Sequence, residues 1–428
     1  MKENTTKVLT KEDLKLQDLL REDLETIQAP VPYMEDVIDK DLREGLTERV
    51  EKEAGFKDNF ESQLEMMIHL FQSESIDDMT LAADGLLTKT KEQFAENQKQ
   101  ILETIRPWEK VVRSLDLFFK NASSSGKVED ASFITVDPER FAGAANTAHF
   151  NIMSEELKNL YYDWEVDGSP LFISYVGDIG DGADLIAKIA EETVAMAVVD
   201  TVDCPNAKAT LSRTKNRKLS GVESYWGHLV VSGTHLIGRG SYDGLEDEPL
   251  TIPSASAITG KLMNTKEGDS ISGFEEGGLV GVKGVRYNSG TRESKEFGER
   301  GMIILKTYKD GSIKIKGDGT ANKSTNNDLR KISKMIVRNK VMKDFVDFCN
   351  KKAFSKWGNI QRTKFKTQIE IYLNDLIRNE AIEGYEEVII KDINEDEVSV
   401  TVALQFYKTI SRYLIGIKGA SIDTIEKV

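Results

Sequence analysis

The sequence predicts an α/β fold built around a mostly parallel sheet, and three observations support this prediction. Short apolar stretches alternate with amphipathic ones between residues 131 and 232. Continuous apolar stretches are typical of strands that are buried on both faces. The chain of 428 residues is long enough to bury a substantial core, and it contains only eight prolines. We therefore expect a sheet that is covered by helices on both faces.

The first 106 residues are expected to form a helical N-terminal region. Thr10 is a suitable N-cap for a segment with leucines at helical spacing, and this segment ends before Pro30. Met67 and Phe71 continue the same spacing, and a further helix is predicted over residues 93–119. Apolar stripes of this kind pack in a core or an interface far more often than they bind a cofactor. We interpret this region as structural.

Beyond a serine-rich break at residues 123–126, strands and helices are expected to alternate. Parallel strands need a crossover connection between them, and amphipathic helices supply it. We expect the resulting α/β core to extend over residues 107–261. The predicted strands cover residues 131–136, 171–176, 194–201 and 228–232, and the predicted helices cover residues 153–162 and 183–189.

A glycine-rich stretch follows and is expected to form a small β-rich insertion over residues 262–327. Its predicted strands cover residues 279–287, 302–308 and 312–316. Asp310-Gly311 lies between the last two strands, and this dipeptide is a strong hairpin signal.

Residues 328–419 are expected to contain two helices followed by strands, and residues 420–428 to form a tail. In the second of these strands, apolar side chains alternate with more polar ones, which predicts one buried face. The helices are predicted over residues 329–353 and 362–378, and the strands over residues 386–392, 397–407 and 410–418.

The composition excludes several classes of partner. The formal net charge is −15 at pH 7, whereas nucleic acids and anionic membranes require a basic surface. The N-terminus has no apolar signal segment, and eighteen apolar residues never occur in a row. Cys204 and Cys349 form neither a disulfide framework nor a zinc motif. We therefore expect a cytoplasmic protein that does not insert into a membrane.

Glycines after the strand at 171–176 lie where a phosphate-binding loop would be placed. Gly177, Gly180 and Gly182 precede a predicted helix. Their spacing differs from G-x-G-x-x-G, and the aspartates among them would repel a phosphate. We therefore predict an ordinary turn between a strand and a helix.

Other candidate sites lack the partners that their chemistry needs. Asp200 and Asp203 follow a predicted strand and could bind Mg²⁺ or act as a carboxylate pair, but turn capping by Asp203 is the preferred interpretation. Gly260-Lys261 resembles the end of a P-loop, yet Leu262 replaces the required Ser or Thr. The four histidines show no zinc or catalytic spacing. The sequence therefore predicts no enzyme active site, no cofactor and no metal.

Residues 329–353 carry many basic side chains although the chain as a whole is acidic. Lys331, Lys334 and Arg338 are spaced to project from one face of the predicted helix, with apolar residues such as Met335 nearby. Such a run is either a solvated helix face or a docking surface for an acidic partner. The second interpretation gains weight because the run opposes the net charge.

Several short motifs occur in an order that resembles a known family. Each motif is weak alone, but their shared order between residues 106 and 419 is specific. The chain resembles the large sheath subunit (TssC) of type VI secretion systems, in the form found in Bacteroidetes. The motifs are Arg106-Pro107-Trp108-Glu109, Leu236-Ile237-Gly238-Arg239-Gly240, Pro253-Ser254-Ala255, Gly284-Val285-Arg286, Val337-Arg338, Ala353-Phe354 and Trp357.

This resemblance implies a contractile tail-sheath-like fold and a structural function. In that family the large subunit pairs with a small sheath subunit (TssB), and the heterodimers polymerise with further copies around a tube of Hcp-like rings. The sheath is attached to a baseplate, and its contraction propels the tube. A ClpV-type unfoldase recycles the contracted sheath. The resemblance implies these partners, and the acidic net charge argues against nucleic acid.

The resemblance also assigns two sets of residues. The predicted helix at 329–353 lies where the family has its tube-facing helix, and the C-terminal strands join sheets of neighbouring protomers. The tube-contact candidates are Lys331, Lys334, Arg338 and Lys343. The intersubunit strand candidates are Val398, Val400, Val402, Leu404, Phe406, Tyr413, Ile415 and Ile417.

Two alternatives stay open from the sequence. A phage-type tail sheath would assemble without a small subunit, and a neighbouring gene for such a subunit would count against it. A cytosolic α/β enzyme with an unrecognised site would be supported by a buried cluster at the sheet edge near Gly177, Asp200 and Gly233.

Overall fold

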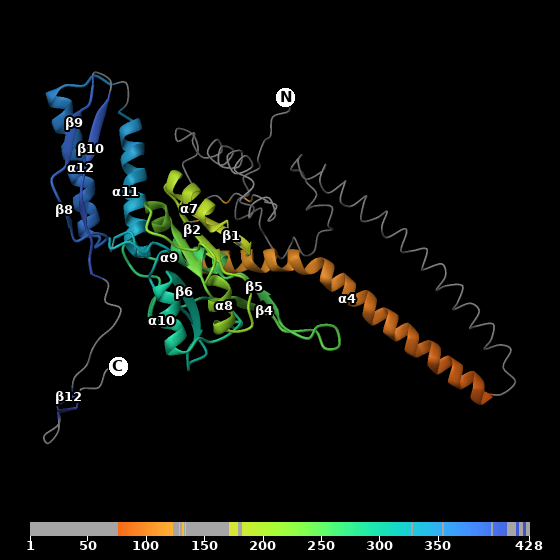
Figure 1. The fold of residues 1–428 in the computed structure, drawn as a ribbon. Helices are drawn as coiled ribbons and strands as arrows, with labels where there is room; N and C mark the ends of the chain where they lie inside the picture. The colour runs from red at the N-terminus through yellow and green to blue at the C-terminus, as the bar shows by residue number, and fades with distance from the viewer. Residues whose placement is uncertain are drawn as a thin grey trace, which may run out of the picture. The chain divides into compact units, whose positions relative to one another are not determined.

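The structure, a computed structural model, describes part of the chain as two compact units (Figure 1). The first unit comprises Met1–Asp116, Ser125–Thr135 and Ile237–Ile252, and the second comprises Leu117–Ser124, Val136–Leu236 and Pro253–Val428. The helices predicted before residue 76, most of the strand at 131–136 and the helix at 153–162 lie outside the described residues. The structure describes residues 76–122, 128, 131, 133, 171–178, 182–326, 328–352, 355–394, 397–408, 417–418 and 423–424.

The first unit contains most of a long helix and a two-stranded sheet. Helix α4 (Ile76–Ala122) includes the predicted helix at 93–119 and begins earlier, and Pro107 lies inside it. Strand β4 (Leu236–Arg239) pairs with β5 (Leu250–Ile252). The first two residues of the Gly238-Arg239-Gly240 motif are the last two residues of strand β4. A Cβ atom at Gly238 would lie 2.9 Å from the Ile252 side chain, so the close pairing of these strands requires glycine.

The second unit is built on a five-stranded sheet with the order β1-β2-β3-β6-β7. The first four strands are parallel, and β7 is antiparallel to β6. The prediction of a mostly parallel sheet is therefore confirmed. The strands are β1 (Phe172–Asp178), β2 (Met196–Asp200), β3 (Leu229–Ser232), β6 (Met302–Thr307) and β7 (Ile313–Lys316).

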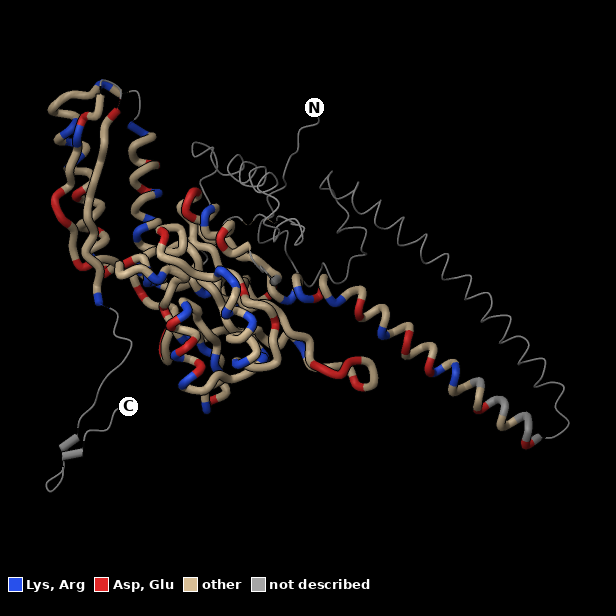
Figure 2. Tube along the Cα trace, in the orientation of Figure 1, with Lys and Arg blue, Asp and Glu red and all other residues tan. Residues whose placement is uncertain are grey.

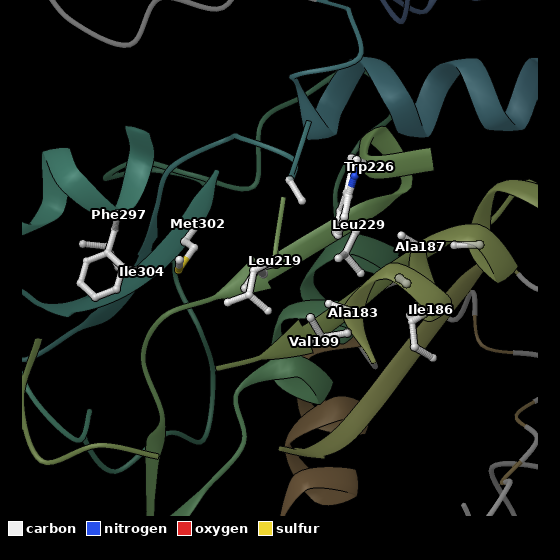
Figure 3. Packing of buried hydrophobic residues seen from close by; sticks show 14 of the residues in the cluster. Ala183, Ile186, Ala187, Val199, Leu219, Trp226, Leu229, Phe297, Met302 and Ile304 are labelled. Atoms are coloured by element: carbon white, nitrogen blue, oxygen red, sulfur yellow. The ribbon is translucent and has the colours of Figure 1, made fainter. Parts of the chain in front are cut away.

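Helices cover both faces of this sheet. Ala197 and Val199 of β2 point toward one face, where they pack in a buried cluster with α7 and other elements (Figure 3). Helix α7 forms because Ala183, Ile186, Ala187 and Ala190 recur on one side of it. Helix α9 instead contacts β1 and β2 from the other face, which Asp200 also faces. The helices are α7 (Ala183–Glu192), α8 (Ala207–Thr214), the 3₁₀ helix η2 (Ser224–His228), α9 (Ala255–Asn264) and α10 (Thr291–Glu299).

The predicted insertion contains one hairpin and not three strands. Strands β6 and β7 are joined across Asp310-Gly311, and Gly311 has a φ of 78°, as the Asp-Gly signal predicted. The strand predicted at 279–287 is wrong, because only single bridges occur there, such as Leu236↔Val285. Gly281 has a φ of 77°, which takes the backbone out of an extended path.

Two helices and a β-ribbon form the C-terminal part of the second unit. The side chains of Phe365, Ile369 and Leu373 on α12 pack against α11 and the ribbon. The predicted helix at 329–353 begins three residues later, and the strand predicted at 397–407 is interrupted after Thr401. The elements are α11 (Ile332–Asn350), α12 (Asn359–Arg378), β8 (Gly384–Tyr385), β9 (Ile389–Asp392), β10 (Val398–Thr401), β11 (Leu404–Gln405), β12 (Ile417–Lys418) and β13 (Asp423–Thr424).

Among the described helices, none has the length and apolar composition needed to cross a membrane.

Candidate functional site

A buried ion-pair network joins α4 to the segment around β4 in the first unit. Arg239, at the end of β4, is only 5% exposed. Its Nε donates to Glu109 Oε1 at 2.8 Å and its Nη2 to Glu109 Oε2 at 3.0 Å, so the pair is bidentate. Nη2 also donates to Glu246 Oε1 at 2.9 Å, while Arg113 donates to Glu109 from the next helical turn. Two motifs that are distant in the sequence therefore bind each other directly.

The network keeps both glutamates ionised. Burial alone would raise the pKa of Glu109, but hydrogen bonds from Arg239 and Arg113 bring this pKa below its usual value. The hydrogen bond from Arg239 likewise lowers the pKa of Glu246. The Tyr242 ring covers the guanidinium at 4.2 Å, which adds a cation–π contact. The acidic loop after β4 is thus fixed at its base by one arginine.

A second buried polar cluster lies at the carboxyl end of the parallel sheet. Asp200, at the end of β2, is fully buried and accepts hydrogen bonds from Ser254 Oγ at 2.6 Å and Ser254 N at 3.1 Å. Its other oxygen accepts from Ala255 N at 2.8 Å. Ser254 Oγ also lies 2.7 Å from Ser232 Oγ on β3. Asp200 therefore caps the N-terminus of α9, which explains the Pro-Ser-Ala motif.

The proposed carboxylate pair is not assembled. Asp203 Oδ1 lies 3.7 Å from Arg286 Nε. Asp200 instead accepts hydrogen bonds from the N-terminus of α9. Burial raises the pKa of Asp200, although the hydrogen bonds from Ser254 and Ala255 oppose this shift. Within the described part of the chain, no group of His, Cys, Asp and Glu residues could hold a metal ion. The buried cluster at this edge is a helix cap.

Among the glycines considered as nucleotide-binding, Gly260 has a packing function. A Cβ atom at Gly260 would lie 2.3 Å from the Phe118 carbonyl oxygen, so this glycine allows α9 to approach the last turns of α4. Gly233 similarly contacts the Phe297 ring. Gly182 is the N-cap of α7, with Asp184 in the first turn, so this strand-to-helix turn carries negative charge. Gly180 lies outside the described residues.

The basic residues near α11 do not form one exposed face. Lys331 has extended backbone angles and precedes the helix, because it pairs with Gly319 in a β-bridge. The Lys334 side chain is 16% exposed and its Nζ lies 2.7 Å from Asp328 Oδ1 and 5.6 Å from the centre of the Phe406 ring. The prediction that these lysines project together from a helix face is therefore wrong.

Arg338 is exposed, whereas Lys343 is partly buried. Arg338 Nη1 lies 3.4 Å from His228 Nε2. His228 Nδ1 lies 2.9 Å from the Ala195 carbonyl oxygen, so Nδ1 carries the proton and Nε2 accepts from Arg338. Burial lowers the pKa of His228, which favours this neutral form. Burial also lowers the pKa of Lys343 to about 7. Of the four tube-contact candidates, only Arg338 is exposed.

The intersubunit strand candidates lie mainly in the β8–β11 ribbon. Strand β9 pairs with β10, and β8 pairs with β11, so each pair is only two strands wide in the described residues. One face of the ribbon packs on α12, as the alternating pattern predicted, while Val398 is 38% exposed. Tyr413 and Ile415 lie outside the described residues, and Ile417 is in β12. The residues on the packed face are Val400, Val402, Leu404 and Phe406.

Side chains from α12 and from the segment just before it hold β9 by polar contacts. Arg362 forms an ion pair with Asp392, and Trp357 Nε1 lies 3.2 Å from the same carboxylate. Lys366 lies 2.8 Å from Glu387, just before β9. These contacts anchor the β9 side of the ribbon. The β10 strand has no strand partner beyond β9 among the described residues.

Three solved structures share this fold. The baseplate of the anti-feeding prophage matches with a TM-score of 0.53 and 15% identity, over 72% of this chain and 79% of that chain. The helical sheath of the anti-feeding prophage in its contracted state matches with a TM-score of 0.53 and 13% identity, over 72% and 81%. The PVC sheath complex of an extracellular contractile injection system, also contracted, matches with a TM-score of 0.52 and 12% identity, over 73% and 81%.

The fold is therefore that of contractile injection system sheath proteins. The sequence also matches the model of the type VI secretion system TssC/VipB central domain over residues 100–313, which is half of the chain. The chain belongs to this TssC/VipB family, whose members are sheath structural proteins and not enzymes. No curated protein sequence matches the chain significantly.

Proposed function

We propose that this chain is the large subunit of a contractile type VI secretion sheath that polymerises with a small, TssB-like subunit around an Hcp-like tube. Contraction of this cytoplasmic sheath would propel the tube from a baseplate, and a ClpV-type unfoldase would recycle the subunits. The order of the motifs supports the form found in Bacteroidetes. Membership of the TssC/VipB family is the observation that carries the proposal.

The β-ribbon supports the proposed linkage between protomers. Edge strands of soluble proteins usually carry a proline, dense lysines or a covering element, because an open edge invites pairing with another chain. Strand β10 carries neither proline nor lysine within Val398–Thr401, and in the described part of the chain β9 is its only strand partner. Addition of a strand from a neighbouring protomer would complete this ribbon and would transmit tension through backbone hydrogen bonds.

The surface near α11 supports a narrower set of tube contacts than the sequence predicted. Lys331 and Lys334 serve the local fold, because Lys334 binds Asp328 and Lys331 lies in a bridge. We retain Arg338 as the main candidate for tube contact. A polar contact of this kind is weakened by salt and by separation, which suits a tube that must leave the sheath.

Co-expression of the chain with the products of its neighbouring genes, followed by electron microscopy, tests the proposal. We expect sheaths that contain this chain and a small subunit in equal amounts and that enclose a tube. A sheath formed by this chain without any small subunit would instead support the phage-type alternative. Failure to form any polymer with every neighbouring product would contradict the sheath function.

A further inference from the structure

Strand β7 is the last strand of the five-stranded sheet, and residues 272–279 run along its outer edge. We call these residues the edge segment. Leu279 N donates to the Ile313 carbonyl oxygen at 2.9 Å, and Ile315 N donates to the Gly277 carbonyl oxygen at 2.8 Å. Backbone groups that β7 directs away from β6 are therefore paired within the same chain.

The edge segment is not itself a strand. Gly273 N donates to the Ile315 carbonyl oxygen at 3.1 Å, and Gly277 N donates back to the Gly273 carbonyl oxygen at 3.1 Å, so the residues between them form a turn. A Cβ atom at Gly277 would lie 2.5 Å from that Gly273 oxygen, so the turn requires glycine. A single bridge, Gly278↔Lys314, aligns the segment with β7. A segment with so few backbone bonds opens more readily than a core strand.

One side chain of β7 holds the edge segment in place. Lysines and arginines occur on most elements of the second unit (Figure 2). Among the described lysines, only Lys314 is buried, at 7% exposure. Its Nζ donates to the Phe274 carbonyl oxygen at 2.7 Å and lies 3.3 Å from the centre of the Phe274 ring. Tyr308 and Asp310 lie farther from this Nζ, at 5.4 Å to the ring centre and 3.8 Å to the carboxylate. A buried ammonium group needs such partners, so Lys314 opposes release of Phe274.

The apolar core contributes little to this contact. Phe274 is 63% exposed and meets the Tyr308 ring edge-on at 5.8 Å. The contact between Lys314 and Phe274 is therefore the main side-chain interaction that the structure shows between β7 and the exposed turn of the edge segment.

Without the edge segment, β7 would present unpaired backbone groups beside apolar side chains. Ile313 and Ile315 carry these groups and are 5% and 0% exposed. An open edge of this kind invites pairing with another chain. Lysines on an edge strand can oppose such pairing, but Lys314 contacts the edge segment instead, and only Lys316 of the two is exposed.

We propose that the edge segment is an autoinhibitory element, which occupies the β7 edge within the chain and prevents β7 from pairing with a strand of a second copy. The contact between Lys314 and Phe274 keeps the element closed. In a sheath whose subunits are linked by added strands, a closed β7 edge leaves the β-ribbon as the site of linkage and excludes wrong pairings. This last consequence rests on the proposed function, whereas the autoinhibitory contact does not.

Hydrogen exchange of the full-length chain tests whether Lys314 keeps the edge segment closed. We expect Lys314→Met to speed exchange of the edge segment and of the Ile315 amide by about tenfold or more, with exchange in β2 unchanged. Lys316→Met is the matched control, because it removes the same charge from an exposed position of the same strand. Its exchange should equal that of the natural chain. Equal exchange in the two variants would overturn the proposal.

A double variant, Gly278→Cys with Lys314→Cys, allows the edge segment to be locked and released in one chain. These two residues face each other in the bridge, and a Cβ atom at Gly278 has open space. We expect the oxidised chain to be monomeric in sedimentation experiments and the reduced chain to self-associate with rising concentration. The two single variants give the background from Cys204 and Cys349. All of these chains also carry Val398→Pro, which blocks strand addition at β10, so the result does not depend on sheath assembly.

Two outcomes of this experiment would contradict the proposal. A reduced double variant whose edge segment exchanges as slowly as in the oxidised chain would show that Lys314 does not keep the segment closed. A reduced chain that exchanges rapidly there and stays monomeric would show that the β7 edge does not accept a second copy. Because the oxidised chain has the closed segment, its cooperative unfolding establishes that the double variant is folded before reduction.

Discussion

Arg239 and Glu109 form a bidentate ion pair that connects strand β4 to helix α4, with N–O distances of 2.8 and 3.0 Å. Both side chains lie well inside the unit, at 6% and 18% exposure. Removal of one partner from a buried pair leaves the other charge without compensation. We therefore expect Arg239 to stabilise the first unit by compensating the charge of Glu109.

We expect Arg239→Met to destabilise the chain by about 3 kcal/mol, because buried Glu246 loses its hydrogen bonds from Arg239 and Glu109 keeps only Arg113. Arg113→Met is the matched control. It removes the ion pair with Glu109 and a long hydrogen bond of 3.5 Å to the Gly238 carbonyl oxygen, both made by a side chain that is 35% exposed, so the loss of stability should stay within about 1 kcal/mol. Urea unfolding of both variants measures the difference. Equal stability of the two variants would show that the network contributes little.

Asp200→Asn should destabilise α9 by about 1–3 kcal/mol, because an amide cannot accept from both Ser254 and Ala255. Burial raises the pKa of Asp200 in the folded chain above the value of about 3.9 that an unfolded aspartate has. The free energy of unfolding of the natural chain therefore falls as the pH rises from the unfolded pKa through the folded pKa. The variant lacks this dependence. Its deficit should therefore be larger at pH 4 than at pH 7, as thermal unfolding at the two pH values would reveal. A deficit that grows with pH would contradict this assignment.

Lys343→Met should stabilise the second unit at pH 6. Folded Lys343 loses its proton near pH 7, whereas an unfolded lysine does so near pH 10.4. Below pH 7 the folded state bears the cost of a buried charge, and this cost disappears as pH rises toward 10. We expect a gain of about 2–4 kcal/mol at pH 6 that shrinks toward pH 10. Chemical unfolding across this range would measure it, and a gain independent of pH would refute the cause.

Arg338→Glu should reduce the number of sheaths that contain a tube without changing the fold, since the side chain is exposed. Lys334→Glu, by contrast, should lower stability by about 1–2 kcal/mol, because it places a second carboxylate beside Asp328. Micrographs of co-expressed complexes and unfolding curves separate the two effects. Normal tube content in Arg338→Glu sheaths would exclude this contact.

Val398→Pro should block addition of a strand to β10 and thus prevent polymerisation. Ile393 N donates to the Glu397 carbonyl oxygen, so alternation along the ladder turns the Val398 N–H away from β9. Proline at this position therefore removes no bond within the ribbon. Ser399→Pro is the control that breaks the internal ladder and should lower stability. Polymerisation of folded Val398→Pro chains would show that the β10 edge is not a link. Proline at Val402, by comparison, would fall where the ladder is already interrupted.

The sequence by itself determined the parallel sheet and the packed face of the ribbon. Both depend on local periodicity, as in the continuous apolar run of β2 and the alternation from Val400 to Phe406. The hairpin at Asp310-Gly311 could also be predicted from the sequence, because the preference of Asp-Gly for tight turns depends on only a few residues. The strand predicted at 279–287 failed, since Gly281 bends a segment that only its apolar composition made strand-like.

The tertiary structure alone decided what the polar residues do. Arg239 and Glu109 are 130 residues apart, and Asp200 and Ala255 are 55 residues apart, so no local sequence pattern predicts the hydrogen bonds between them. A buried charge must find its partner in space, whichever part of the chain supplies it. Contacts with other parts of the chain also give the basic residues near α11 different environments. Their spacing predicted one exposed face, but a β-bridge holds Lys331 outside the helix, Asp328 binds Lys334, and Lys343 is partly buried.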